Sequence, residues 1–89
     1  YKKYQEYEFI YENSNKTYHG KIDLLLVGDK ESIIIDYKLK NTKDKAYIDQ
    51  LNGYKEVISN KLNLPTSCYL YSIIDEVFEK IWQIANFVV

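Results

Sequence analysis

The sequence contains no arginine, and all 12 of its basic residues are lysines. A bidentate guanidinium clamp on phosphate is therefore excluded, so any phosphate contact must use lysine, a backbone amide or a neutral side chain. The chain also has 13 acidic residues and a net charge of −1, so no overall positive field marks it as a nucleic-acid binder.

Cysteine and long apolar runs are equally scarce. The lone Cys68 excludes an intrachain disulfide and a cysteine-rich metal or iron–sulfur site within this chain, and we interpret it as a small apolar strand residue of a cytoplasmic protein. The longest apolar runs, at residues 24–27 and 33–35, are too short to span a bilayer, and no signal peptide is visible. We expect one domain over residues 1–89, cut from a larger protein because it begins at Tyr1 without Met.

The hydrophobic pattern predicts an α/β fold. Strand-like alternation and turn signals indicate a three-stranded antiparallel meander, over residues 4–12, 17–27 and 32–39. The period then becomes helical over residues 44–62, and strand composition returns over residues 67–74. The apolar stripe of the helix is formed by Ile48, Leu51, Ile58 and Leu62. A crossover through this helix favours a return strand parallel to its neighbour, and therefore a mixed sheet.

The last segment, residues 77–89, has two interpretations. Its apolar residues fit an amphipathic helix, which the periodicity favours. A strand over residues 77–84, joined to its predecessor through Asp75 and Glu76, is the alternative.

Two acids and a lysine interrupt the apolar strands. Asp36 and Lys38 are two residues apart and therefore lie on one face of a strand, and Asp23 lies in the preceding strand. A hairpin centred between residues 29 and 30 places Asp23 and Asp36 at the same level. Two carboxylates there would form a hard-oxygen site for Mg²⁺ or Mn²⁺, with a lysine beside a metal-bound water. The simpler interpretation is a strand-end ion pair, of Asp36 with Lys38 or of Asp23 with Lys21.

Three motifs resemble the RecB-type branch of the PD-(D/E)XK nuclease superfamily. Residues 20–23 read Gly-Lys-Ile-Asp, residues 36–38 read Asp-Tyr-Lys, and residues 50–54 read Gln-Leu-Asn-Gly-Tyr. They match the Gly-x-x-Asp, Asp-Tyr-Lys and Gln-x-x-x-Tyr motifs of that branch in order and in the expected elements. The resemblance spans residues 7–74.

The resemblance implies a restriction-endonuclease-like mixed sheet, a strand in the last segment, and metal-dependent hydrolysis of DNA. Asp23, Asp36 and the backbone carbonyl of Tyr37 would hold Mg²⁺ or Mn²⁺, and Lys38 would position the water nucleophile. Gln50 and Tyr54 are implied to hold DNA near the metal. The parent protein is expected to be an exonuclease of DNA repair or recombination, working with a helicase motor in the same or a partner chain.

The spacing of Gln50 and Tyr54 on the predicted helix also favours a position near the metal site. Gln50 and Tyr54 are four residues apart and border the apolar stripe, so both are expected to face the Lys38 cleft while burying little surface. The lysines at 43, 45 and 61 would add local positive charge.

The sequence also departs from the family. The helix that usually precedes the first strand, carrying a further metal ligand, lies before the start of this chain. We interpret His19 as an exposed or hairpin-facing residue, with metal coordination as the weaker alternative. The competing functions are a catalytically inactive nuclease fold that binds DNA or scaffolds a repair complex, and a structural protein unrelated to nucleic acid. The intact set of Asp23, Asp36 and Lys38 argues against the first of these, and the second ranks behind it.

Overall fold

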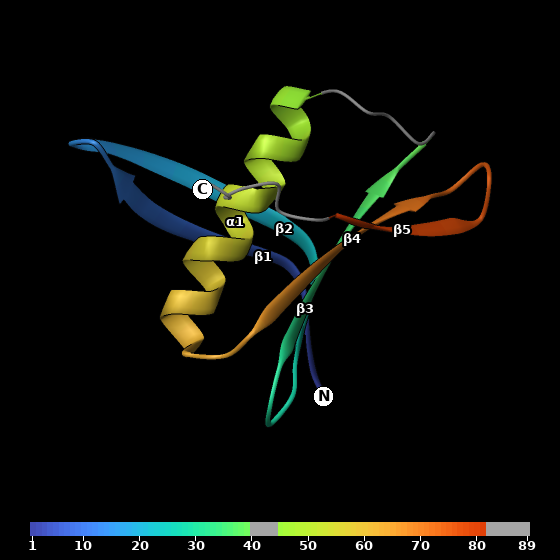
Figure 1. The fold of residues 1–89 in the computed structure, drawn as a ribbon, viewed down its shortest axis with the longest axis horizontal. Coiled ribbons are helices and arrows are strands. Elements are labelled where there is room, and N and C mark those ends of the chain that lie inside the picture. Colours follow the sequence, from blue (N-terminus) through green and yellow to red (C-terminus); the bar gives the residue numbers. More distant parts are fainter. Residues whose placement is uncertain (40–44, 82–89) are drawn as a thin grey trace, which may run out of the picture.

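The strands and the helix follow one another in the order that the sequence predicts. The computed structural model describes residues 1–39 and 45–81. Within this part of the chain one sheet has the strand order β1-β2-β3-β4-β5, in which β3 and β4 are parallel and the other neighbours antiparallel (Figure 1). The elements are β1 (Lys2–Asn13), β2 (Lys16–Val27), β3 (Ser32–Lys38), α1 (Lys45–Leu62), β4 (Thr66–Ser72) and β5 (Val77–Ile81). The predicted α/β class and mixed sheet are confirmed.

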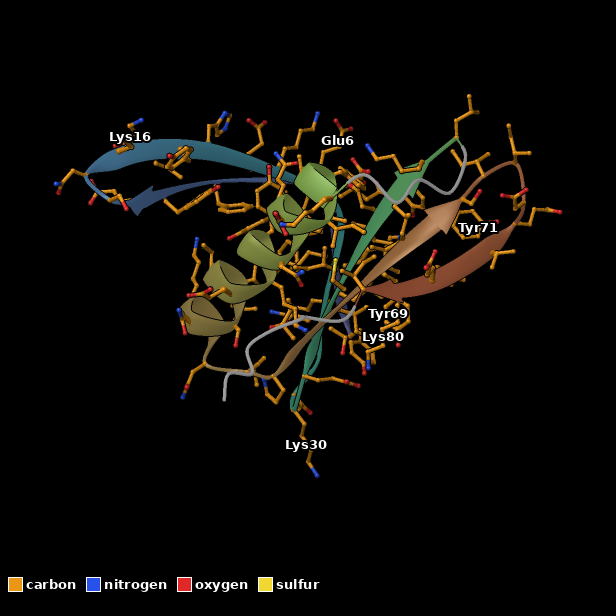
Figure 2. The ribbon with its side chains drawn as sticks, turned by 45° about the horizontal axis from the view of Figure 1, so that its top comes forward. Glu6, Lys16, Lys30, Tyr69, Tyr71 and Lys80 are labelled. Carbon is orange, nitrogen blue, oxygen red and sulfur yellow. The ribbon has the colours of Figure 1, made fainter. Side chains whose placement is uncertain are left out.

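Left-handed backbone conformations mark the points where the chain reverses. Ser14 and Asn15, between β1 and β2, have φ values of 52° and 65°, as a two-residue type I′ hairpin turn requires. Asn63, just after α1, has φ 56° and ends the helix in the left-handed conformation common at that position. In Figure 2, Lys16 and Lys30 lie at the tips of the two hairpins, at opposite ends of β2. This turn lies between the first two predicted strands, at residues 4–12 and 17–27, and confirms that they form a hairpin.

β2 and β3 pair in the register that the apolar pattern predicts. Leu24 is opposite Ile35 and Val27 is opposite Ser32, so the hairpin is centred between residues 29 and 30. A slip of one residue would turn every apolar side chain to the other face, which is why the pattern fixes this register. Continued by one position beyond the Leu24–Ile35 pair, the same register places residues 23 and 36 opposite each other.

Residues 77–81 form a strand, and the helix that periodicity favours is wrong for them. β5 pairs antiparallel with β4, from Ser72 opposite Val77 to Cys68 opposite Ile81. Glu76 has φ 55° in the connecting turn. Pairing with β4 satisfies backbone groups that β4 would otherwise leave open, and this tertiary gain outweighs helical periodicity. Much of the helical pattern comes from residues 82–89, which lie outside the described residues.

α1 packs across one face of the sheet (Figure 1). It buries Leu51, Tyr54 and Ile58 over sheet residues that include Ile34 and Cys68, both completely shielded from solvent. Cys68 is thus the buried apolar strand residue that the sequence predicts, and burial raises the pKa of its thiol to about 12. In the described part of the chain no helix has the length and apolarity needed to cross a bilayer.

The two faces of the sheet are different. Ser32 and Ile34 are fully buried on the α1 face of β3, and strand alternation puts Asp36 and Lys38 on that same face. The opposite face carries Tyr69 and Tyr71 of β4, with Lys80 of β5 paired to Tyr69 (Figure 2). The candidate residues of β3 therefore lie beside the helix and not on the aromatic face.

Gly20 is required by packing. It lies opposite Phe9 in the β1–β2 ladder, and a Cβ at residue 20 would lie only 2.4 Å from Cζ of the Phe9 ring. Phe9 is itself buried and packs edge-on against Tyr54, with the ring centroids 5.2 Å apart. The glycine of the Gly-x-x-Asp motif therefore lets an aromatic ring of the core lie flat on β2.

Gly20→Ala is expected to lower the free energy of unfolding by about 1–3 kcal/mol, the usual cost of overpacking a core. Gly53→Ala is the matched control, because a Cβ at this helical position meets nothing within 4 Å. It should stabilise the protein by up to about 1 kcal/mol, since alanine is the better helix former. Urea unfolding of both variants measures the difference. Equal effects from the two substitutions would contradict the packing role of Gly20.

Candidate metal centre

The β1–β2 ladder is interrupted at Asp23. Its register is the same throughout, but the pair of Glu6 with Asp23 is missing, and Glu6 has φ 50°, which is costly for a non-glycine residue. On β2 the core residue before this point is Ile22 and the core residue after it is Leu25. In a regular strand, residues three apart point to opposite faces of the sheet, so the alternation of side chains in β2 reverses just before Asp23. The side chain at 23 therefore points to the α1 face, as that of Leu25 does. Glu6 is marked in Figure 2.

The two carboxyl groups meet where β2 and β3 separate. The β2–β3 ladder ends at the pair of Leu24 and Ile35. Beyond it, the backbone N–H of Tyr37 donates to Oδ2 of Asp23 at 2.9 Å, so a side chain takes the place of a strand carbonyl. The Asp36 side chain, on the α1 face, lies close enough to Asp23 for a hydrogen bond between the two carboxyl groups to raise its pKa. The structure thus brings together the two acids that the sequence singles out.

Asp36 is strongly affected by its surroundings. Its side chain is only 13% exposed, and desolvation raises its pKa from 3.8 to about 7, with the hydrogen bond and charge of Asp23 acting in the same direction and Lys38 opposing them. When protonated, the carboxyl group of Asp36 can donate a hydrogen bond to the Asp23 carboxylate. Two carboxyl groups that share one proton suit a divalent cation, which would replace the proton and neutralise both charges.

Lys38 completes this side of β3. Its Nζ lies 3.9 Å from Oδ2 of Asp36, beyond hydrogen-bond distance, and its side chain is 37% exposed. The same ammonium lies 3.9 Å from the centroid of the Tyr47 ring, which α1 supplies. The simple ion pair of Asp36 with Lys38 is therefore present but loose, and the lysine remains partly open to a ligand.

The other simple ion pair, between Asp23 and Lys21, is not formed. Nζ of Lys21 lies 3.0 Å from Oε1 of Glu6, and this hydrogen bond and its charge raise the pKa of Lys21. The reason is the reversal of side-chain alternation in β2 between residues 21 and 23, which points Lys21 and Asp23 to different faces of the sheet. The carboxylate of Asp23 is left to Tyr37 and Asp36.

A third ligand would have to come from the backbone or from water. Among residues 1–39 and 45–81, no three His, Cys, Asp or Glu side chains are placed to hold a metal ion together. In an extended strand the N–H and C=O of one residue point to the same side, so the Tyr37 carbonyl faces the side on which its N–H meets Asp23. A hollow of about 280 Å³, lined by Gln5, Glu6, Asp23 and Tyr37, opens beside it. These hard-oxygen donors fit Mg²⁺ or Mn²⁺.

Gln50 and Tyr54 occupy different environments. Gln50 is exposed, but Tyr54 is 7% exposed and packs against Phe9 and Tyr11. The prediction that both border the apolar stripe and bury little is wrong for Tyr54. Its ring lies in the stripe itself, three residues after Leu51, because a phenol can bury its ring like any other aromatic side chain.

The predicted local positive charge is not gathered at the site. Lys45 and Lys61 are at opposite ends of α1, a separation of about 24 Å at 1.5 Å per residue. Lys45 is paired with Asp49 at 2.7 Å, and Lys61 donates to the hydroxyl of Tyr7 at 2.9 Å. Of these two lysines, only Lys45 lies at the same end of α1 as Tyr47. Lys43 lies outside the described residues.

His19 is an exposed hairpin residue, as its simpler interpretation predicts. Its Nε2 lies 3.0 Å from Oε1 of Glu8 on the neighbouring strand, and its side chain is 63% exposed. Within the described residues it joins no cluster of metal-ligating side chains.

Tyr47 is the site residue that sequence reasoning missed. It precedes Leu51 by four residues, so the same helical stripe places it on the inward face. That spacing predicts an inward ring, but it gives no indication that the ring lies under Lys38.

Comparisons with known proteins place the chain in no family: no family model matches it, and neither a curated protein nor a solved structure is significantly similar to it. The likeness to the RecB-type nucleases therefore depends on the three motifs and on the geometry around Asp23 and Asp36.

Proposed function

We propose that this chain is the core of a divalent-metal-dependent deoxyribonuclease of the RecB-type branch of the PD-(D/E)XK superfamily. One observation carries the proposal: the carboxyl groups of Asp23 and Asp36 adjoin where two strands part, with Lys38 on the same face. Structural ion pairs alone do not account for two acids held together in a half-buried position, since each raises the cost of ionising the other. A cation bound between them removes that cost.

In the proposed mechanism, Asp23, Asp36 and the Tyr37 carbonyl hold Mg²⁺ or Mn²⁺. When bound, the cation would lower the pKa of a water molecule and neutralise negative charge on a phosphate. Lys38 would hold the attacking water by a hydrogen bond and stabilise the charge that develops on the phosphate oxygens. The exposed Gln50 offers its amide to DNA.

The wider setting of the proposal comes from the resemblance. The substrate is DNA, and the reaction is phosphodiester hydrolysis by an exonuclease domain. The parent protein is a cytoplasmic enzyme of DNA repair or recombination that works with a helicase motor. Tyr54 serves this function by holding α1 on the sheet, since its ring is buried.

A nuclease assay tests the proposal. Linear and closed circular DNA are incubated with the protein in Mn²⁺, in Mg²⁺ and in chelator, with Asp36→Asn as the test variant. Asp49→Asn is the matched control, because Asp49 is an exposed acid of α1 paired with Lys45. We expect metal-dependent loss of linear DNA in the wild type and the control only. Metal-independent hydrolysis, or full activity of Asp36→Asn, would contradict the assignment, and DNA binding without hydrolysis would favour a non-catalytic module.

A further inference from the structure

Lys38 has a close neighbour that the nuclease motifs do not include. Its ammonium lies 3.9 Å from the centroid of the Tyr47 ring, well inside the distance of about 6 Å at which a cation interacts with an aromatic face. Its separation from Oδ2 of Asp36 is also 3.9 Å, which is too long for a hydrogen bond. The ammonium therefore has two close neighbours, the Asp36 carboxyl group and the Tyr47 ring.

The Tyr47 ring is itself held in place. It packs against the hydrophobic core near the start of α1. Its hydroxyl is buried and, among the described residues, has no hydrogen-bond partner. A buried hydroxyl without a partner is unfavourable, and within the described part of the chain no hydrogen bond of this hydroxyl holds the ring. The contact of Tyr47 with Lys38 is made by the aromatic face.

A fixed ring meets a need of the proposed reaction. Lysine carries a compact charge on a flexible stem of four carbons, and several rotamers are open to a side chain that is 37% exposed. A cation between Asp23 and Asp36 would repel the ammonium and weaken its ion pair with Asp36. An aromatic face attracts the ammonium without binding the metal, so it keeps the lysine beside the site when the carboxylates are occupied.

We propose that Tyr47 is a positioning residue that holds the Lys38 ammonium at the Asp23–Asp36 centre through its ring face. The inference rests on the proposed nuclease function and adds to it a residue outside the three motifs. Tyr47 touches neither metal nor DNA in this role. It acts on turnover through Lys38, and it leaves metal binding and substrate binding to other residues.

The test compares Tyr47→Leu with Tyr47→Phe in steady-state hydrolysis of linear DNA with Mn²⁺. Leucine keeps apolar bulk but has no aromatic face, and we expect kcat to fall about tenfold, the scale of a partly desolvated cation–π contact. KM for DNA and the Mn²⁺ affinity should stay at their wild-type values. Phenylalanine keeps the face and should retain wild-type kcat. Tyr11→Leu is the matched control, because Tyr11 also packs against the core but lies opposite Tyr18, near the other end of the β1–β2 hairpin.

An NMR measurement separates this inference from the nuclease assignment. The ring should shift the ε-methylene protons of Lys38 upfield in the wild type and in Tyr47→Phe, and the shift should vanish in Tyr47→Leu. Wild-type kcat in Tyr47→Leu while Lys38→Ala is inactive would overturn the positioning role alone, as would an unchanged Lys38 shift or an equal loss in Tyr47→Phe. A wild type that does not hydrolyse DNA in Mn²⁺ would overturn the proposed function and this role with it.

Discussion

Lys38→Ala is expected to reduce DNA hydrolysis by at least about a hundredfold, the usual effect of removing one group that stabilises a transition-state charge. The ammonium lies beside the carboxyl pair but does not hydrogen-bond to it, at 3.9 Å from Asp36. Its contribution is therefore made to the attacking water and the phosphate, and not to the bound cation. Mn²⁺ affinity should consequently stay unchanged or rise slightly, because a positive charge has been removed from the site.

Steady-state kinetics and calorimetric titration with Mn²⁺ measure the two halves of this prediction. Lys45→Ala is the matched control, because Lys45 is an exposed lysine paired with Asp49 at the start of α1. It should leave turnover and metal affinity near their wild-type values. Turnover of Lys38→Ala at the wild-type rate would reject the catalytic role of Lys38, and a loss of Mn²⁺ binding in this variant would show that it acts on the metal site instead.

The stability of the metal-free protein is expected to fall as pH rises from about 4 to about 7. The pKa of Asp36 is 3.8 in its ordinary state and about 7 in the folded chain, mainly because the folded chain desolvates it. Between these values the folded protein keeps a proton that the unfolded chain has released, so raising the pH favours unfolding. The contribution is fully present below pH 4 and lost as pH passes through 7. It amounts to about 2–4 kcal/mol.

Asp36→Asn isolates this effect from other titrating groups. The variant should match the wild type near pH 4 and be more stable than it near pH 8, because asparagine stays neutral. Mn²⁺ should stabilise the wild type at pH 8 and have little effect on the variant. Urea unfolding at both pH values, with and without Mn²⁺, measures the differences. Parallel pH profiles for the two proteins would show that Asp36 is not desolvated as described.

The sheet was largely predictable because its signals are local. The apolar run at residues 33–35 and the run at 24–27 fix the β2–β3 register through alternation, and that register alone predicts that Asp23 and Asp36 lie at one level. Alternation also puts the two acids on one face, because Leu25 and Ile34, each two residues away, are opposite each other. The reversal of faces before Asp23 in β2 is not predictable in this way. Glu6, with φ 50°, has no feature in the sequence that indicates a left-handed backbone.

The helix and the last strand were less predictable, because their environments are set by distant parts of the chain. The stripe that the sequence predicts for α1 contains only aliphatic residues and omits Tyr54, whose ring is buried against Phe9 of β1. It also omits Tyr47, whose partner Lys38 is on β3. β5 took a strand conformation because β4 offers it an edge. In each case a tertiary contact, absent from any local pattern, decided the outcome.

A crystal structure of the protein soaked in Mn²⁺ tests the central claim most directly. The account predicts one strong anomalous peak between Asp23 and Asp36, with an oxygen of each carboxylate and the Tyr37 carbonyl at about 2.0–2.3 Å from it, as hard-oxygen sites require. Lys38 should remain over Tyr47 and outside the coordination sphere. An empty space between the two carboxyl groups at saturating Mn²⁺, or a peak bound elsewhere on the chain, would contradict the account.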